Sequence, residues 1–398
     1  MTAPILVLNC GSSSVKYQMI DMSTETVLAQ GLVDKIGLDG SSISHKVGTD
    51  KHSIVEPIAD HQAALALVVR AFANWGPTLH EAIAVAHRVV HGGETFRQPT
   101  LITPTVIAQI TALSGLAPLH NPPALAGIAA AQSVLPSVPH VAIFDTAFFA
   151  TLPAEAYTYA IDRDLASKYQ IRKYGFHGTS HGYVSQASAN FLGRDISSFN
   201  QIICHLGNGA SISAIQAGQP IDTSMGLTPV SGLVMGTRSG DVDPGLFAYL
   251  ERSANMDAVA VDTMLNKHSG MAGMTGGSSD FRDIWAEIRN GDDTARLAMD
   301  IYQHRLVSYI GAYMALLGHT DVLVFTAGVG ENDHQVRAEL VSRLAGFGVK
   351  LDPARNTPHN QQATVISTDD SSVTVLVVPT NEELAMARAT YKLVEDHA

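Results

Sequence analysis

Residues 202–215 read IICHLGNGASISAI, in which two apolar runs flank the polar stretch 205–209. Apolar runs joined by a turn that contains glycine predict a β-hairpin. Residues 5–20 read ILVLNCGSSSVKYQMI and repeat this design around a turn at 9–14. Small residues in both turns leave backbone N–H groups uncovered, which suits the binding of a phosphate chain. The sequence therefore predicts two related nucleotide-binding domains, with two ordinary Gly/Asn turns as the alternative at this point.

The length and composition of the chain set its class. With 398 residues, of which 46% are hydrophobic and 16% charged, the chain is long enough for two or three globular domains with substantial cores. Its formal net charge of −12 argues against nucleic acid and against an anionic membrane surface as main partners, because both require a large basic face. An anionic ligand must then be bound by a local group of Arg and Lys.

The compartment is predicted from the amino terminus and the cysteines. The first residues, MTAPILVLNC, hold no basic region and enter a strand directly, and no uninterrupted apolar run approaches ~18 residues. Cys10 and Cys204 each lie in an apolar strand, so a disulfide framework is not expected. We expect a soluble, cytoplasmic protein that is not exported and does not bind a membrane.

Periodicity and capping residues predict the order of the elements. Residues 61–75 have helical apolar spacing after Asp60 as N-cap, and Gly76-Pro77 ends the helix. The apolar stretch 83–90 predicts a buried strand that delivers residues 91–94 to a loop. Further strands are predicted within 37–53 and over 141–144, 322–325 and 373–378, and helices over 104–113, 124–134 and 384–395 and within 246–264 and 282–318.

A second glycine-rich stretch, 328–332 (GVGEN), follows the strand predicted at 322–325. We expect it to open a helix at about Asp333, a placement that suits a phosphate or an adenosine. It is not a dinucleotide fingerprint, because G-x-G-x-x-G fails at Asp333, and the sequence contains no G-x-x-x-x-G-K-[ST]. Neither a Rossmann dehydrogenase nor a P-loop enzyme is therefore supported.

Eight short motifs occur together along the whole chain. They are residues 9–17 (NCGSSSVKY), 87–94 (HRVVHGGE), 144–148 (FDTAF), 174–181 (YGFHGTSH), 205–209 (HLGNG), 235–241 (MGTRSGD), 328–332 (GVGEN) and 380–383 (TNEE). Their identity and order resemble the acetate kinase family from end to end. Two departures are slight: Cys10 stands where the family commonly has Ala, and Phe149 stands where His often follows DTAF.

The resemblance implies an α/β fold of two duplicated βββαβαβα ribonuclease-H-like domains, as in the superfamily of sugar kinases, actin and heat-shock ATPases, with an interdomain ATP cleft. The N-terminal domain is expected at 1–148, joined by a C-terminal helix at 384–398, and the nucleotide-binding domain at 149–383. The resemblance also implies a homodimer, with acetate and ATP or ADP as small-molecule substrates. Mg²⁺, or Mn²⁺ in its place, is the implied cofactor.

The implied activity is the reversible phosphorylation of acetate by ATP to acetyl phosphate, by direct in-line transfer. Such a transfer brings two anions together, so the site must offset their repulsion. Arg88 and Arg238 lie among small or polar residues, and each can bind a carboxylate or phosphoryl group through a planar fork. By resemblance Arg88 faces the carboxylate and Arg238 stabilises the transferring group. For a lone loop arginine, a solvated surface charge is the alternative.

His177 and His181 are four residues apart, a spacing also found in helical zinc sites. Zinc is not expected, because the HExxH glutamate is missing, Gly178 disfavours a helix and no third ligand is evident. By resemblance His177 donates to the equatorial oxygens of the transition state, with a structural histidine as the alternative. Asp145 is also counted as catalytic. Since acetate is already an anion, we expect Asp145 to hold Mg²⁺ through water or to orient an arginine.

The remaining site residues are assigned by resemblance. The acetyl pocket is expected to consist of Val90, Leu119, Phe176 and Pro229. Asn9 and Glu382 match the family's metal positions, although Glu382 could instead complement a helix dipole. Asp280 could instead be only a helix N-cap. The nucleotide is expected to contact Ser12, Ser14, Lys16, His205, Leu206, Gly207, Asn208, Gly209, Asp280, Phe281, Arg282, Gly328, Val329, Gly330, Glu331 and Asn332.

Two other functions stay open from the sequence. A propionate or butyrate kinase differs only in the size of its acyl pocket. An ATPase switch of the actin or chaperone type, in which hydrolysis drives a partner, belongs to another class. Arg88 together with the apolar wall of Val90, Leu119 and Phe176 favours a carboxylate kinase, because a switch has no need of them.

Overall fold

The computed structural model describes residues 2–358 and 362–397 and divides into two compact units. Unit 1 consists of Met1–Ala150 together with Asn381–Ala398, and unit 2 of Thr151–Thr380. The end of the chain therefore returns to the unit that contains its beginning. Among the described residues, no helix is both long and apolar enough to cross a membrane.

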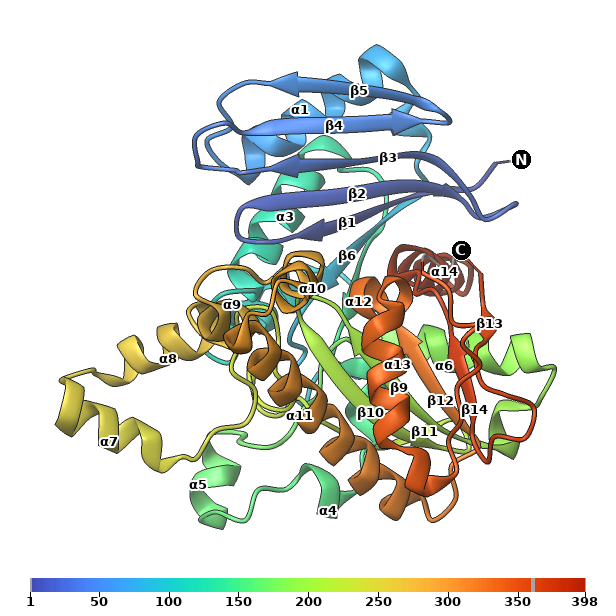
Figure 1. Ribbon diagram of the computed structural model, residues 1–398. Helices are drawn as coiled ribbons and strands as arrows, with labels where there is room; N and C mark the ends of the chain where they lie inside the picture. Colours follow the sequence, from blue (N-terminus) through green and yellow to red (C-terminus); the bar gives the residue numbers. More distant parts are fainter. Residues whose placement is uncertain (1, 359–361, 398) are drawn as a thin grey trace. The chain divides into compact units, whose positions relative to one another are not determined.

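The sheet of unit 1 grows from the N-terminal hairpin. Within the described residues it has eight strands in the order β5-β4-β3-β2-β1-β6-β8-β7. Strands β1 to β5 form an antiparallel meander, whereas β6 and β8 pair in parallel on the other side of β1 (Figure 1). The bounds are β1 Pro4–Cys10, β2 Ser14–Asp21, β3 Thr26–Asp34, β4 Ser42–Val47, β5 Asp50–Val55, β6 Ala84–Val89, β7 Thr100–Leu101 and β8 His140–Phe144.

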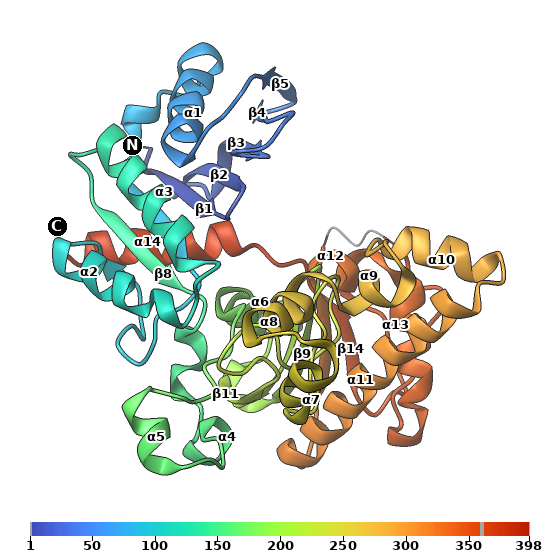
Figure 2. The same ribbon diagram turned by 90° about the vertical axis from the view of Figure 1, so that its left-hand side faces the viewer.

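The helices of unit 1 complete its core. Asp60 accepts a hydrogen bond from the Ala63 N–H at 2.8 Å and caps α1 (His61–Trp75) as predicted. Helix α3 (Asn121–Val134) packs beside α1 (Figure 2), and both cover the face of the sheet that carries Leu6 and Leu8. Helix α14 (Glu382–Glu395) packs on β1 and β6. The remaining helices are α2 Pro104–Ala112 and the 3-10 turns η1 Leu79–Glu81, η2 Leu113–Gly115 and η3 Ala147–Thr151.

Unit 2 is built around the second predicted hairpin. Its sheet has the order β11-β10-β9-β12-β14-β13 in the described residues, with β9 and β10 antiparallel and β9, β12 and β14 parallel. Leu206 and Ala210 are the last pair before the turn. The bounds are β9 Asn200–Leu206, β10 Ala210–Gln216, β11 Gln219–Thr223, β12 Val322–Thr326, β13 Thr364–Val365 and β14 Thr374–Val377.

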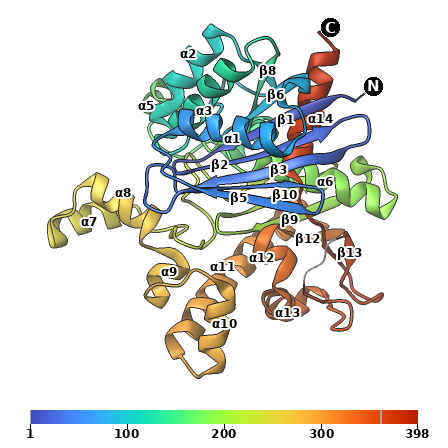
Figure 3. The same ribbon diagram turned by 90° about the horizontal axis from the view of Figure 1, so that it is seen from above.

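Two helices cover opposite faces of this second sheet, α6 (Gly178–Leu192) and the long α11 (Asp293–Leu317), as Figures 1 and 3 show. Helices α7 (Gly245–Ala254) and α8 (Ala258–Lys267) extend away from the sheet (Figure 3). The others are α4 Ala154–Tyr157, α5 Arg163–Lys168, α9 Gly270–Thr275, α10 Phe281–Arg289, α12 Ala327–Asn332 and α13 His334–Arg343, with 3-10 turns η4 Ile196–Ser198 and η5 Ala345–Phe347.

The two sheets share one plan. The order β3-β2-β1-β6-β8 in unit 1 corresponds to β11-β10-β9-β12-β14 in unit 2, with the same antiparallel and parallel relations. Both predicted hairpins form, and each is followed by parallel strands that are joined through helices, as right-handed crossover units require. The prediction of a duplicated α/β fold is therefore confirmed at the level of strand topology.

Three predicted helical boundaries need correction. Residues 328–332 do not form an open loop before a helix: they belong to α12, and Asp333 then caps the separate α13 through the Gln335 and Val336 N–H groups. The prediction that Gly178 disfavours a helix is wrong for this stretch, because α6 begins at Gly178, at the end of the helix rather than in its interior. Helix α3 begins at Asn121 rather than at residue 124, because proline is tolerated in a first turn, where its missing N–H has no partner to lose.

Candidate active site

In unit 1, charged side chains meet where the parallel strands end. Arg88 lies near the end of β6, and Asp145 directly follows β8. The guanidinium donates through Nε and Nη2 to the two oxygens of the buried Asp145, at 2.9 and 2.7 Å. Such a bidentate fork fixes the plane of an arginine. Burial by itself disfavours the charge on Arg88, but Asp145 and then Glu382 outweigh it, so the pKa of Arg88 is raised.

The neighbours of this ion pair carry oxygen ligands. Asn9, at the end of β1, accepts from Arg88 Nη1 at 3.5 Å. Glu382 is the first residue of α14, whose N-cap Asn381 accepts from the Leu384 N–H. The pKa of Glu382 is raised, mainly by burial; the charge of Arg88 opposes the shift, and the carboxylate of Asp145 adds to it. A carboxylate placed in this way is stabilised by an added cation.

The oxygen atoms of these side chains are donors of the kind that Mg²⁺ binds. Within residues 2–358 and 362–397, no group of three or more His, Cys, Asp or Glu is arranged to hold a metal ion. One amide and two carboxylates, from Asn9, Asp145 and Glu382, are the hard oxygen ligands that suit Mg²⁺ when water and phosphate oxygens complete the shell. Asn9 and Glu382 thus lie on elements that converge beside Arg88, as β1, β6 and α14 pack together.

Other predicted residues of unit 1 surround the ends of the same strands. Val90 is half-buried directly after β6, and Leu119 is 43% exposed in the turn before α3. Ser12 lies in the β1–β2 turn, which the Gly11 N–H closes on the Ser14 carbonyl at 2.8 Å. Ser14 begins β2, and the Lys16 side chain is exposed on it.

In unit 2, an imidazole and a guanidinium converge on the second hairpin turn. His177 precedes α6 in the left-handed region, with φ of 57°. Arg238 lies in the long loop before α7 and donates from Nη1 to the Pro229 carbonyl at 2.7 Å. A Cβ built on Gly209 would lie 2.9 Å from Arg238 Nη2 and 3.3 Å from His177 Nε2. Glycine is therefore needed at 209 for the close approach of both groups.

The same loop also fixes the neighbouring turn residue. The Gly236 N–H donates to the Asn208 carbonyl at 2.9 Å, and a Cβ on Gly236 would overlap the side-chain oxygen of Asn208. Residues 235–241 thus pack directly on 205–209, two motifs that are separated in the sequence. Phe176, before His177, is fully buried, and Pro229 is half-buried beside Arg238.

His177 and His181 do not form a metal pair. His177 Nδ1 and His181 Nε2 both bond the hydroxyl of Ser211, at 2.9 and 2.8 Å. The ring of His205 stacks on that of His177, with centroids 4.2 Å apart, and is itself held by the Ser180 hydroxyl at 2.8 Å. Hydroxyls and a ring stack thus position the imidazole of His177.

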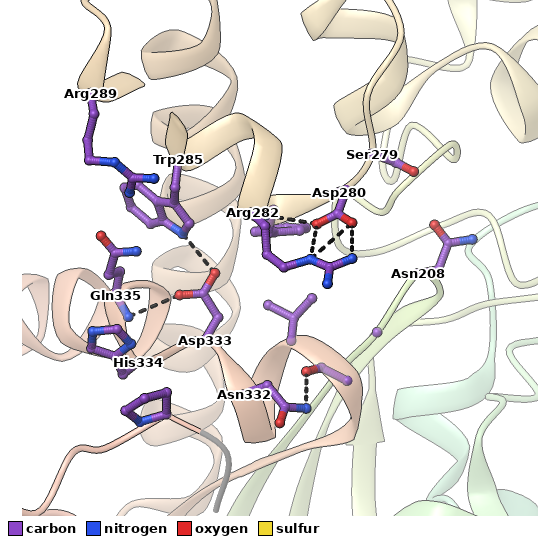
Figure 4. Close-up of a pocket in the computed structure, with 15 residues that line it drawn as sticks. Asn208, Ser279, Asp280, Arg282, Trp285, Arg289, Asn332, Asp333, His334 and Gln335 are labelled. Atoms are coloured by element: carbon purple, nitrogen blue, oxygen red, sulfur yellow. Dashed lines mark hydrogen bonds and ion pairs between the residues drawn. The ribbon is translucent and has the colours of Figure 1, made fainter. Parts of the chain in front are cut away.

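A cavity of about 680 Å³ opens next to the turn of unit 2 (Figure 4). Trp285 and Val329 supply apolar walls, whereas Asp280 and Arg282 form an ion pair at its edge. Hydrogen bonds from Arg282 lower the pKa of Asp280 to about 2. The cavity is lined by Gly207, Asn208, Ser279, Asp280, Phe281, Arg282, Trp285, Arg289, Gly328, Val329, Asn332, Asp333, His334, Gln335 and Pro358.

Eight of the predicted nucleotide residues line this cavity and five from the same motifs do not. The eight are Gly207, Asn208, Asp280, Phe281, Arg282, Gly328, Val329 and Asn332. Leu206 is fully buried in the sheet, and Glu331 instead accepts from the Ala327 and Thr380 N–H groups, at 2.8 and 3.0 Å. His205, Gly209 and Gly330 are likewise outside the lining.

Trp285 and Asp333 line the cavity but are not among the nucleotide residues predicted from the sequence. Trp285 Nε1 donates to Asp333 Oδ2 at 2.7 Å, and this bond joins α10 to the start of α13 (Figure 4). Two signals were present: Trp285 follows Phe281 by four residues, on one helical face, and Asp333 directly follows the 328–332 motif.

The arrangement can be compared with known proteins. The sequence profile of the Acetokinase family matches residues 4–388. The chain belongs to the acetokinase family. Acetate kinase of Clavibacter michiganensis subsp. michiganensis (strain NCPPB 382) is 53% identical over 386 residues, which cover 96% of this chain and 97% of that protein. The family resemblance drawn from the eight motifs is confirmed.

Similar solved structures confirm the fold. Acetate kinase of Porphyromonas gingivalis has 44% identity and a TM-score of 0.92, covering 98% of this chain and 100% of that chain. A propionate kinase from Francisella tularensis subsp. tularensis SCHU S4 has 40% identity and a TM-score of 0.93, covering 98% and 99%. This chain therefore shares its fold with two proteins whose names give different acyl substrates.

Proposed function

We propose that the protein transfers the γ-phosphoryl group of ATP reversibly to acetate and so produces acetyl phosphate and ADP. The observation that carries this proposal is the convergence of His177 and Arg238 on Gly209, next to the 680 Å³ cavity. Two cationic or donor groups beside a glycine turn can stabilise the equatorial oxygens of a transferring phosphoryl group. An acetate oxygen attacks the γ-phosphorus, and the bond to the bridging oxygen breaks with its electron pair leaving on ADP.

We assign the nucleotide to the cavity of unit 2. Its flat apolar wall at Trp285 and its polar edge at Asp280 suit an adenosine, whereas the turn at 207–209 suits the phosphates. Ser12 in the β1–β2 turn, together with Ser14 and Lys16 on β2, is proposed to contact the terminal phosphates, because this hairpin repeats the same glycine-and-serine design.

Asp145 acts through charge rather than as a base. Acetate has no proton to lose at neutral pH, and Asp145 already accepts both donors of the Arg88 fork. It therefore orients Arg88, which is proposed to bind the acetate carboxylate. Asn9, Glu382 and Asp145, the last through water, would hold Mg²⁺ or Mn²⁺. The ion would supply charge neutralisation of the phosphate oxygens.

The acyl group is proposed to lie against Val90, Leu119, Phe176 and Pro229. Val90 is only two residues beyond Arg88, so a carboxylate bound by Arg88 brings its methyl group within reach of this side chain. A β-branched side chain leaves little space for a longer acid. We therefore propose acetate over propionate or butyrate as the preferred substrate.

We propose a cytoplasmic homodimer with domains 1–148 plus 384–398 and 149–383. Helix α7 buries none of its ten residues, and Phe247, Tyr249 and Val259 on α7 and α8 are exposed. Three exposed apolar side chains on neighbouring helices favour contact with a second copy of the protein. Light scattering of the purified protein at micromolar concentration measures the mass and tests this.

Trapping with hydroxylamine tests the activity. The enzyme is incubated with ATP, Mg²⁺ and acetate, and the acetyl phosphate is converted to the coloured hydroxamate. The expected result is hydroxamate in proportion to ADP. ADP release without hydroxamate would instead support an ATPase switch. Parallel reactions with propionate and butyrate rank the acids, and equal or faster use of propionate would move the assignment to a propionate kinase.

A further inference from the structure

A buried chain of hydrogen bonds leads to His177 from the interior of unit 2. Ser213 Oγ bonds His181 Nδ1 at 2.8 Å, and His181 Nε2 bonds Ser211 Oγ at 2.8 Å. Ser211 Oγ in turn bonds His177 Nδ1 at 2.9 Å. Ser211 and Ser213 lie on β10, whereas His181 is in the first turn of α6. Two rigid elements therefore carry the chain.

The inner members of this chain are neutral. Ser211, Ser213 and His181 are each 0% exposed. Burial, followed by the charge of the nearby His205, lowers the pKa of His181 well below its usual value. A neutral imidazole has one N–H and one bare nitrogen, and a hydroxyl has one proton to donate. The protons in the chain therefore point all toward His177, all toward Ser213, or from both rings onto Ser211. The third arrangement leaves the proton of the buried Ser211 hydroxyl without an acceptor among the described residues, so two directions remain.

The hydrogen bonding of the Ser213 hydroxyl distinguishes between the two directions. When the chain runs toward His177, the Ser213 hydroxyl donates to His181 Nδ1 and is satisfied. In the reverse direction it accepts from His181, and its own proton needs another acceptor. Among the described residues, the Ser213 hydroxyl has a hydrogen bond with His181 alone. Leaving a buried donor unpaired shifts such an equilibrium by about 5- to 150-fold, so the chain runs toward His177.

The direction of the hydrogen bonds determines which ring nitrogen of His177 carries the proton. Ser211 then donates to His177 Nδ1, and the proton of the ring sits on Nε2, the nitrogen that faces Gly209 and Arg238. We propose that Ser213, His181 and Ser211 are positioning residues that hold His177 in the Nε2–H tautomer, so that it donates to an anionic oxygen. That the oxygen belongs to a phosphoryl group rests on the proposed function; the tautomer itself does not.

The tautomer can be measured without any substrate. Long-range ¹H–¹⁵N spectra of the full-length protein labelled with ¹⁵N-histidine distinguish Nε2–H rings from Nδ1–H rings. The same spectra of the His177→Gln and His181→Gln variants assign the signals of the two residues. We expect Nε2–H for both residues. In Ser213→Ala the direction of the chain is no longer fixed, so both rings should become mixtures, although Ser213 does not touch His177. An Nδ1–H signal for His177 in the unaltered protein would overturn the proposal.

Ser188→Ala is the matched control. Ser188 is also 0% exposed and lies on α6, but its hydroxyl bonds the Val184 carbonyl and is outside the chain. It should leave both rings as Nε2–H and kcat unchanged. Ser211→Ala, which removes the link itself, should lower kcat by about 10- to 100-fold with the KM for acetate within about twofold, since the wrong tautomer impairs a catalytic histidine strongly.

The two possible failures are separable. If no hydroxamate forms but Ser213→Ala still mixes the tautomers, the proposed function is wrong and the positioning chain stands. If hydroxamate forms and the His177 signal is the same in Ser213→Ala as in Ser188→Ala, the chain does not set the tautomer and the inference is wrong.

Discussion

Arg88 and Arg238 are positioned in different ways, and this predicts different kinetic roles. The carboxylate of Asp145 fixes the plane of Arg88 through two hydrogen bonds. The Pro229 carbonyl anchors Arg238 through one nitrogen, and the missing side chain of Gly209 lets the other nitrogen approach the turn. An oriented fork recognises a carboxylate, whereas a cation beside a phosphate turn stabilises charge in the transition state.

Arg238→Ala should therefore lower kcat by about 10³- to 10⁵-fold, the range for an arginine in phosphoryl transfer. Arg88→Ala should also raise the KM for acetate. Steady-state hydroxamate kinetics measure both. Arg70→Ala is the control, because Arg70 forms an exposed ion pair with Glu56 and its loss should change neither constant. Near wild-type turnover in Arg238→Ala would remove Arg238 from the mechanism.

Val90 should set the size of the acyl group. One additional methylene in a hydrophobic pocket changes discrimination by about 10- to 200-fold, so acetate should exceed propionate in kcat/KM by this factor. Val90→Ala should narrow the ratio by making space for the methylene. Val55→Ala, at a position that is 75% exposed on β5, is the control and should leave the ratio as it is. An unchanged ratio in Val90→Ala would place Val90 outside the pocket.

At the level of elements, the sequence predicts those helix ends and hairpins that are determined by residues close together in the chain. Asp60 and Gly76 mark the two ends of α1 because capping acts within a few residues. Both hairpins are predictable from apolar runs around short glycine turns. Helix α12 is not, because Gly328 and Gly330 favour a loop and the helix depends on a residue from the following helix, Arg337.

Arg337 stabilises the C-terminal end of α12 through hydrogen bonds. It is fully buried, and its guanidinium donates to the carbonyls of Gly330, Glu331 and Thr357, at 2.8, 2.9 and 2.7 Å, and to Asn356 Oδ1 at 2.8 Å. Burial lowers the pKa of Arg337 to about 10, which still leaves it charged at neutral pH. A charged donor thus satisfies carbonyls that a helix end leaves unpaired.

Loss of the Arg337 hydrogen bonds should weaken the binding of ATP more than the binding of acetate. In Arg337→Met the freed carbonyls are unpaired and α12, which presents part of the cavity lining, loses its fixed position. We expect the KM for ATP to rise about tenfold or more with the KM for acetate within about threefold, and the free energy of unfolding to fall by about 3 kcal/mol. Arg343→Met on the same helix, where the arginine pairs with Asp300, is the control. Equal rises in both KM values would contradict the assignment.

For the whole molecule, topology places the site groups of each unit at the same edge of that unit's own sheet. Arg88, Asp145, the turn at 207–209 and α12 all lie at or beyond the carboxyl ends of parallel strands, where ligands of α/β sheets bind. Duplication of the hairpin, visible in the sequence, therefore predicts the location of both groups of residues. The cavity wall from α10 was not predictable in full, since the contact of Trp285 with Asp333 is long-range and no local pattern specifies it.

Buried histidines should make the whole fold acid-sensitive. His45, His87, His140 and His181 are at most 5% exposed, and burial is the main cause that lowers each pKa. The His87 Nε2 to His140 Nδ1 bond of 2.9 Å itself requires a bare nitrogen. These rings stay neutral in the folded protein at pH values where the unfolded chain, with a histidine pKa near ~6.5, binds protons.

The sign of the pH dependence follows from proton counting. A histidine with a lowered folded pKa contributes stability that is present above the unfolded pKa and is lost as pH falls below it. Four such rings allow a slope of up to about 5 kcal/mol per pH unit below pH 6.5. We expect the Tm to be nearly constant from pH 8 to 7.5 and to fall steeply between pH 6.5 and 5.5. His87→Asn should reduce that slope, whereas His319→Gln, at an exposed position, should not. A Tm that stays constant down to pH 5.5 would show that the buried rings take up protons without loss of the fold.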